Sequence, residues 1–207
     1  MRKRPKLLRS IYGLGEQSSR KMIGLIGTHS GVGVTHTGLL IAGFLGNVLG
    51  RKTALVEMNT HKDFEQIEEA YYGKGEMTSR LFKMKHVFYY KNVKQWETTD
   101  ILNEDYEYII FDFGSDMKKS QDEFLRCDKK IVISSLSDWK RKYLVQFIQS
   151  NQDIKGYSSW MYLFIFGQKR DLLDLKREVK VRAKLMGYEP VPYMLSKETI
   201  GLFHSII

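Results

Sequence analysis

The fold of this chain is decided by residues 23–35, which read Ile23-Gly24-Leu25-Ile26-Gly27-Thr28-His29-Ser30-Gly31-Val32-Gly33-Val34-Thr35. An apolar run leads into a glycine-rich turn, and an apolar segment of helical length begins near Thr35. This order of strand, glycine-rich loop and helix is the setting of a phosphate-binding P-loop. In such a loop the glycines let successive backbone N–H groups face a phosphate, and the N-terminus of the helix adds partial positive charge.

The loop lacks the lysine that a P-loop normally carries. A complete loop ends in Gly-Lys-Thr or Gly-Lys-Ser, where the lysine contacts the β- and γ-phosphates and the hydroxyl group ligates Mg²⁺. Here the tripeptide is Gly33-Val34-Thr35, so the hydroxyl is kept and the ammonium group is lost. Valine offers neither charge nor hydrogen bond, which removes a contact worth about 1.5–3 kcal/mol.

Beyond the loop, short apolar and β-branched runs alternate with amphipathic segments of helical length, which predicts a parallel sheet covered by helices. The expected strands are Ile23–Gly27, Thr53–Met58, His86–Tyr90, Tyr108–Phe113, Lys130–Ser135, Trp160–Phe166 and Glu189–Tyr193. The expected helices are Thr35–Leu49, Lys62–Tyr72, Met117–Leu125, Asp138–Gln149, Leu172–Met186 and one from Lys197. Central strands with successive apolar residues indicate burial on both faces. We therefore predict an α/β, doubly wound, mostly parallel sheet of about seven strands, P-loop NTPase-like.

Three stretches carry a resemblance to a known family. Gly27–Gly38 and the apolar helix after it resemble the deviant Walker A region of the MinD/ParA-type P-loop ATPases of the SIMIBI class, whose pattern is Lys-Gly-Gly-x-Gly-Lys-Thr. Tyr106–Gly114 is similar to the Walker B strand of that family, and Thr53–Asn59 resembles its second strand. The resemblance implies that His29 replaces a signature lysine, which in the family reaches across a nucleotide-sandwich dimer.

The same resemblance implies a nucleotide site and its metal. Thr35 and Asp112 are the side chains expected at the Mg²⁺ ion when a nucleotide binds. Glu57 and Asn59 replace the Asp-x-Asp pair of the family, which orients the attacking water. Neither Glu57 nor Asn59 is assigned a catalytic role. The expected nucleotide-binding residues are Gly27, His29, Ser30, Gly31, Val32, Gly33, Val34, Thr35 and His36. The expected cofactor is ATP or ADP with Mg²⁺, or none if the loop is vestigial.

Each of these residues also has a purely structural interpretation. The glycines serve any turn that needs positive φ angles, and threonine is an ordinary residue for starting a helix. Asp112 is then a buried carboxylate at a strand end and His29 a loop histidine. If His29 instead stands in for the lysine, it is only partly charged near pH 7.

Charge and composition bound the organisation of the chain. The net charge is +9, and residues 1–22 hold seven basic residues against one acidic residue. We expect a basic N-terminal arm over residues 1–21 and a single MinD/ParA-like domain over residues 22–207. The arm begins like a signal peptide but no apolar segment follows it, and no run reaches the roughly 18 apolar residues of a membrane span. A single cysteine excludes an intrachain disulfide and indicates a reducing compartment such as the cytoplasm. The family resemblance adds the alternative of a peripheral position at the inner face of the membrane.

These features favour a degenerate P-loop protein with weak or absent ATP hydrolysis. By analogy with the TadZ/CpaE-like pilus-assembly proteins, whose ATPase portion the chain resembles, we expect a scaffold, positioning or regulatory factor for a membrane-associated pilus or secretion assembly. Its expected partners are another protein and a second copy of itself. One alternative is a slow Mg²⁺-dependent ATPase that works as a nucleotide-sandwich dimer. Another, with nucleic acid as the less favoured partner, is a ParA-like DNA-binding partition factor whose basic surfaces are residues 1–9 and Lys140-Arg141-Lys142. The lysines and aromatic residues of Phe82–Trp96 also suggest nucleic-acid binding, although a strand and its flanking loop account for them more simply.

Overall fold

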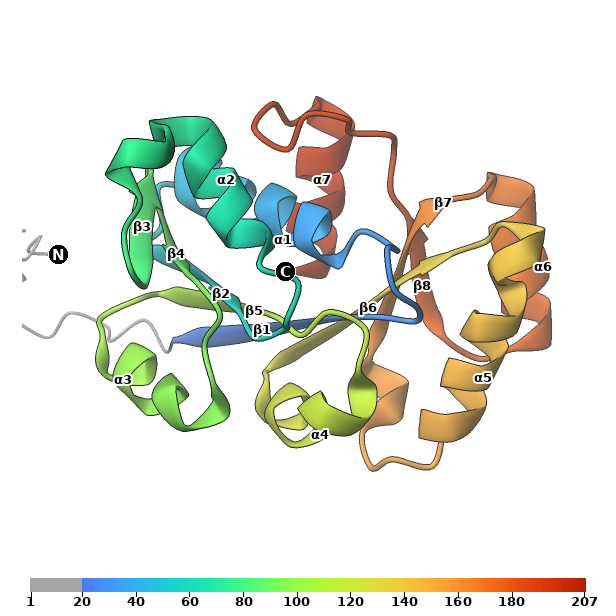
Figure 1. Cartoon of the computed structure of the whole chain (residues 1–207). Coiled ribbons are helices and arrows are strands. Elements are labelled where there is room, and N and C mark those ends of the chain that lie inside the picture. The colour runs from blue at the N-terminus through green and yellow to red at the C-terminus, as the bar shows by residue number, and fades with distance from the viewer. Residues whose placement is uncertain (1–19) are drawn as a thin grey trace, which may run out of the picture.

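The computed structural model describes residues 20–207, so the predicted basic arm lies almost wholly outside the described residues. One eight-stranded sheet runs through the described part, with helices on both of its faces (Figure 1). This confirms the predicted α/β, doubly wound fold, with one strand more than the expected seven.

The sheet is parallel except at one edge. Its strands are β1 (Lys21–Gly27), β2 (Thr53–Glu57), β3 (Leu81–Met84), β4 (Val87–Tyr90), β5 (Tyr108–Asp112), β6 (Lys129–Ser135), β7 (Met161–Phe166) and β8 (Arg182–Leu185). Their order across the sheet is β3-β4-β2-β5-β1-β6-β7-β8, and only β3 pairs antiparallel to its neighbour. From β1 the chain passes to β2, β3 and β4 on one side, returns to β5 next to β1, and then crosses to β6 on the other side. A crevice at the carboxyl ends of the strands beside such a crossing is where open α/β sheets bind ligands.

Within residues 20–207, seven helices cover the sheet. They are α1 (Val34–Gly43), α2 (Asp63–Tyr72), α3 (Thr98–Asn103), α4 (Met117–Arg126), α5 (Arg141–Asn151), α6 (Lys169–Glu178) and α7 (Lys197–Ile206). A π-helical turn, Phe44–Val48, extends α1, and short 3₁₀ turns occur at Lys74–Glu76, Gln95–Glu97, Asp138–Lys140 and Tyr157–Ser159. None of the helices in the described part of the chain is long and apolar enough to cross a membrane.

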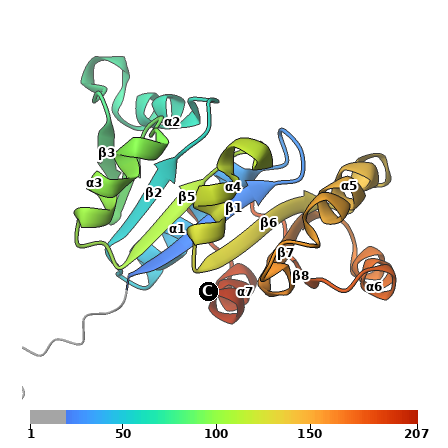
Figure 2. The same cartoon turned by 90° about the horizontal axis from the view of Figure 1, so that it is seen from below.

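Each face of the sheet has its own hydrophobic core. Side chains of β1 alternate between them, with Ile23 and Leu25 in the core under α1, α2 and α7 and Ile26 in the core on the other face. Helices α3 and α4 lie on that other face, and α5 and α6 cover its end near β7 and β8 (Figure 2). Burial on both sides explains why the central strands are apolar at successive residues.

The last third of the chain corrects two expectations. The predicted helix Leu172–Met186 ends at Glu178, and the eighth strand is Arg182–Leu185, not Glu189–Tyr193. After Glu178 the residues alternate between apolar and basic, which is the period of a strand and not of a helix. Residues 189–193 contain Pro190 and Pro192, which cannot donate ladder hydrogen bonds and leave this stretch as a turn.

Candidate functional site

The glycine-rich loop joins β1 to α1 at the carboxyl edge of the sheet. Gly31 and Gly33 adopt positive φ angles of 73° and 93°, and Gly33 is the N-cap of α1. A Cβ atom on Gly33 would lie 2.7 Å from Cδ1 of Ile165 and would displace the end of that side chain. The positive φ angle is the stronger reason for glycine here. The conformation of the loop therefore depends on glycine at these two positions.

Val34 belongs to the hydrophobic core. The residue is buried, and its Cγ2 and the Cγ1 of Val32 lie so near Gly27 that a Cβ there would be 2.8 Å and 2.7 Å from them. At the position of the P-loop lysine, two valine side chains thus pack against the end of β1. The structure places no cation there.

A cavity of about 250 Å³ lies over the loop. Its lining residues are His29, Ser30, Gly31, Val32, Gly33, Val34, Thr35, His36, His61, Asp63, Gly114 and Ser115. Three histidines are present, but no lysine or arginine contributes to the lining of this cavity. Backbone N–H groups and the N-terminus of α1 are therefore the main features here that attract an anion.

Thr35 and Asp112 are brought together by the fold. The Thr35 hydroxyl lies 2.6 Å from Oδ2 of Asp112, whose Oδ1 accepts a hydrogen bond of 2.9 Å from the Gly114 N–H. Asp112 is fully buried at the end of β5. Burial raises the pKa of its carboxyl group above the ordinary value, although the hydrogen bonds from Thr35 and Gly114 oppose that rise.

Asp63 is a site residue that the sequence analysis missed. It is the first residue of α2, and its Oδ2 lies 3.1 Å from the Thr35 hydroxyl oxygen. The sequence shows that a helix begins here but not that its first turn returns to the loop after β1. Thr35 therefore lies between two carboxylates, Asp63 and Asp112.

His29 points toward α5. Its Nδ1 lies 3.1 Å from the Thr28 hydroxyl, and its ring stacks on Tyr143 with 5.2 Å between the ring centres. Burial lowers the pKa of His29, and the nearby Lys140 ammonium lowers it further. At neutral pH the ring is mostly uncharged, so it is a poor replacement for a lysine.

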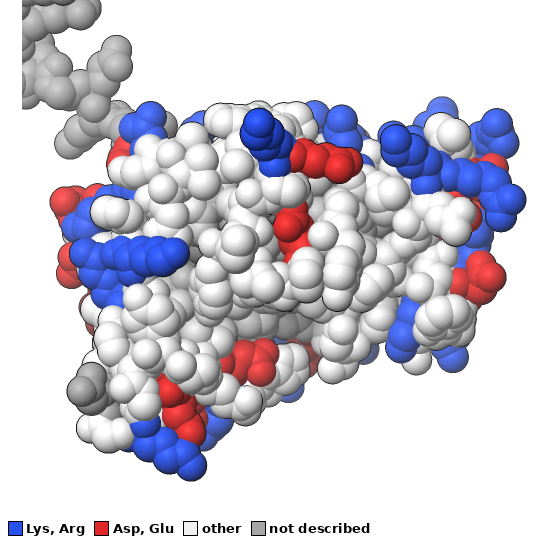
Figure 3. All heavy atoms as spheres, turned by 90° about the horizontal axis from the view of Figure 1, so that it is seen from above, with Lys and Arg blue, Asp and Glu red and all other residues white. Residues whose placement is uncertain are grey.

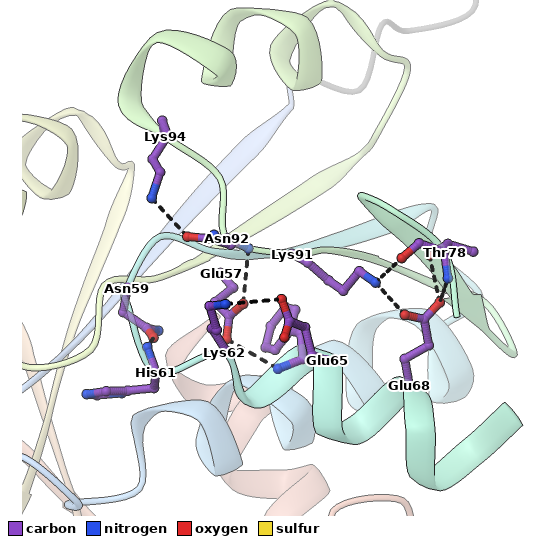
Figure 4. A network of polar contacts seen from close by, with 11 residues as sticks. Glu57, Asn59, His61, Lys62, Glu65, Glu68, Thr78, Lys91, Asn92 and Lys94 are labelled. Carbon is purple, nitrogen blue, oxygen red and sulfur yellow. Dashed lines mark hydrogen bonds and ion pairs between the residues drawn. The ribbon is translucent and has the colours of Figure 1, made fainter. Parts of the chain in front are cut away.

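Glu57 and Asn59 do not line the cavity. The Glu57 carboxylate is fully buried and accepts hydrogen bonds from the Phe64 N–H (3.2 Å) and the Asn92 N–H (3.0 Å), as Figure 4 shows in part. Burial raises the pKa of Glu57, and these backbone donors oppose the rise. The Asn59 side chain donates to the Asp112 carbonyl oxygen at 3.3 Å and accepts from the His61 N–H at 2.9 Å. Both side chains are thus engaged with backbone groups, and neither lines the loop cavity.

A larger and mostly apolar cavity, about 330 Å³, lies beside the first. The two share Gly31, Val32, Gly33 and His36, and the remaining lining residues are Ile165, Phe166, Met186, Gly187, Tyr188, Glu189 and Pro190. The His36 ring contacts the Glu189 carbonyl oxygen at 2.6 Å, which ties the start of α1 to the loop before α7. Burial opposes ionisation of the Glu189 carboxyl, but donors from Ser196 and Thr199 outweigh it and lower the pKa. The two cavities adjoin at these shared loop residues, and we call them together the crevice, with the smaller cavity as its polar end and the larger one as its apolar end.

Comparison with known proteins places this crevice in context. No protein-family model and no curated protein match the sequence. A putative plasmid partition protein from Borrelia burgdorferi bound to AMPPNP aligns with 90% of this chain and 96% of that chain at a TM-score of 0.68 and 13% identity. The chain has the fold of the ParA/MinD-type P-loop ATPases. The MinC:MinD cell division complex from Aquifex aeolicus (TM-score 0.62, 16% identity, 82% of each chain) agrees with this. So does MinD with Mg-ADP from Pyrococcus horikoshii (TM-score 0.59, 13% identity, 83% of this chain and 82% of that chain).

Proposed function

We propose that this chain is a degenerate P-loop protein of the ParA/MinD type that hydrolyses ATP weakly or not at all and acts as a scaffold, positioning or regulatory factor. The observation that carries the proposal is the buried Val34 at the lysine position, in a cavity lined by no lysine or arginine. Phosphoryl transfer depends on positioned cations that neutralise developing charge. Glu57 and Asn59, at the water-orienting positions, are held elsewhere by backbone groups.

The site keeps a reduced capacity for a ligand. When ATP or ADP binds with Mg²⁺, backbone N–H groups of the loop hold the phosphates and Thr35 and Asp112 lie at the metal. The solved neighbours include proteins bound to AMPPNP and to Mg-ADP. If the loop is vestigial, the crevice holds no cofactor and the loop serves only the fold.

A protein partner is the third part of the proposal. Trp139, Phe166 and Tyr188 are 75%, 52% and 81% exposed, and the last two lie at the rim of the larger cavity. Exposed aromatic side chains around a site are typical of protein contacts. We assign this rim to a partner in a cytoplasmic assembly at the inner face of the membrane, such as a pilus or secretion system, or to a second copy of the chain. One neighbour was solved as a MinC:MinD complex.

The test restores the missing charge. Val34→Lys is expected to raise ATP affinity about tenfold or more in isothermal titration with Mg²⁺, because a charge-assisted hydrogen bond is worth about 1.5–3 kcal/mol. Val34→Met, which changes the side chain without adding charge, is the matched control. Phosphate release should stay at background in all three proteins. Sustained ATP turnover by the wild-type protein would refute the proposal.

A slow ATPase working as a nucleotide-sandwich dimer is a second candidate, favoured by the 2.6 Å contact between Thr35 and Asp112. Tight Mg²⁺-dependent ATP binding that is abolished by Thr35→Ala, together with ATP-dependent dimers in light scattering, would support this candidate over the scaffold.

A partition factor that binds DNA is a third candidate. Residues 138–142 and 168–184 contain ten basic and four acidic residues, and their basic side chains gather at the end of the molecule formed by α5 and α6 (Figure 3). A solved neighbour is a plasmid partition protein. Salt-dependent duplex binding that is lost when basic residues of this end are reversed tests the candidate.

A further inference from the structure

Asp63 adds a carboxylate to the lining of a loop cavity that no lysine or arginine lines. Its carboxylate lines the smaller cavity and contacts the Thr35 hydroxyl, which also contacts Asp112. A hydroxyl group has one hydrogen to donate, so Thr35 can donate to only one of these two carboxyl groups at a time. The Asp63 carboxylate therefore faces the polar end of the crevice with no lysine or arginine in the lining to compensate its charge.

The carboxylate is held in this place because α2 is anchored. Glu57 accepts a hydrogen bond from the N–H of Phe64, the residue after Asp63, and the Phe64 side chain is fully buried. Further along α2, Glu68 forms a buried ion pair with Lys91 and accepts a hydrogen bond from the Thr78 N–H at 2.8 Å (Figure 4). Moving α2 away from the loop would break a buried charged pair, which strongly disfavours such a motion.

The apolar end of the crevice has no comparable charge. Glu189 is the acidic residue among its lining residues, and the Glu189 carboxylate is turned to Ser196 and Thr199 at the start of α7. A ring system can enter this end without approaching Asp63. Each phosphate added to a ligand whose ring lies at the apolar end extends it, in contrast, toward the Asp63 carboxylate, where like charges repel.

We propose that Asp63 is a specificity-determining residue that makes the crevice select nucleosides or nucleoside monophosphates and reject nucleoside triphosphates. This rests on the proposed loss of ATPase activity, and it adds the class of ligand that the same site accepts. The discrimination comes from a fixed carboxylate and needs no movement of the loop.

The experiment compares a series of ligands that differ only in phosphate number. Adenosine, AMP, ADP and ATP are titrated calorimetrically into the wild-type protein, Asp63→Asn and Glu65→Gln, each with and without Mg²⁺. Glu65 is the matched control because it lies on the first turns of α2 but does not line the cavity. We expect wild-type affinity to fall with each phosphate. Asp63→Asn should bind ATP about tenfold more tightly than wild type, and its affinity for AMP should stay within about twofold of wild type. The reason is that only the repulsion of the distal phosphates is removed. Glu65→Gln should bind all four ligands like wild type.

Three results would overturn the inference. Weaker Mg-ATP binding by Asp63→Asn would make Asp63 a metal ligand, and equal responses of Asp63→Asn and Glu65→Gln would make the effect one of overall charge. The third result is that no ligand binds to the wild-type protein, to Asp63→Asn or to Asp63→Ala. It would show that the Asp63 carboxylate is not what excludes triphosphates. Thermal unfolding of each variant confirms that it is folded. ATP turnover, measured separately, tests the proposed function and not this selectivity.

Discussion

Asp112 shows how one buried carboxylate sets a pH dependence. Burial raises its folded-state pKa above the unfolded value, so its contribution to stability is fully present below the unfolded pKa and is lost as the pH rises through the folded pKa. Asp112→Asn removes this titration and keeps an acceptor for the Gly114 N–H. We expect the variant to melt at a higher temperature than wild type at pH 8 and the difference to vanish toward pH 4, as followed by circular dichroism.

The control for this change is Asp122→Asn on the exposed face of α4. It removes an equal charge without removing a buried carboxylate, so its melting temperature should follow wild type across the same pH range. A pH-independent effect of Asp112→Asn, or an equal effect of Asp122→Asn, would contradict the assignment.

At the scale of residues, the sequence predicted the loop better than the groups around it. The positions of Gly31, Gly33, Thr35 and Asp112 followed from motif spacing along two strands that lie next to each other in the sheet. Asp63 could not be predicted, because its approach to Thr35 depends on how α2 packs. The buried role of Glu57 was hidden for a similar reason, since its side chain is satisfied by N–H groups of residues 64 and 92.

At the scale of elements, α2 depends on a buried ion pair for its position. Glu68 and Lys91 are 0% and 4% exposed at their side chains, and Glu68 also accepts from the Thr78 N–H and hydroxyl. Lys91→Met leaves the Glu68 carboxylate buried without its counter-charge. We expect the free energy of unfolding, measured by urea denaturation, to fall by about 3–5 kcal/mol.

Two further variants test whether the loss comes from the buried charge of Glu68. Adding Glu68→Gln to Lys91→Met should recover much of the loss, because the amide oxygen can still accept from Thr78 and no charge remains buried. Lys74→Met removes the partner of Glu69 in an exposed ion pair, and it should change stability by less than about 1 kcal/mol. Equal losses for Lys91→Met and Lys74→Met would show that burial of the pair is not what matters.

Elements with a long apolar core were predictable, whereas short edge elements were not. β1, β5 and β6 are buried on both faces and stand out as apolar runs. β3 and β8 have four residues each and alternate between exposed and buried positions, so their signal is weak beside the neighbouring helical pattern. At such edges one face and one side of the strand remain open, and polar residues replace the apolar run.

At the scale of the whole molecule, charge is segregated. A net charge of +6 is found in residues 1–22, and the same net charge is found in residues 138–142 and 168–184, which we call the basic end. The whole chain carries +9, so the remaining residues are net negative. Within the basic end, the described ion pairs engage only Arg141 and Arg177, which leaves eight cations without a carboxylate partner there. A concentration of unpaired cations gives non-specific, salt-dependent attraction to polyanions.

This basic end predicts where duplex DNA would bind. Lys176 and Lys180 are exposed and make no described ion pair. The double variant Lys176→Glu with Lys180→Glu should bind a labelled duplex at least about tenfold more weakly. The dependence of log affinity on log salt concentration should become shallower by about two, because each lost phosphate contact lowers this slope by about one. Lys118→Glu with Lys119→Glu on α4 makes the same change in net charge and should alter affinity far less. Fluorescence anisotropy across a salt series measures both. If the two double variants lose affinity equally, the attraction comes from total charge and not from this surface, and the case for a DNA-binding partition factor loses its structural support.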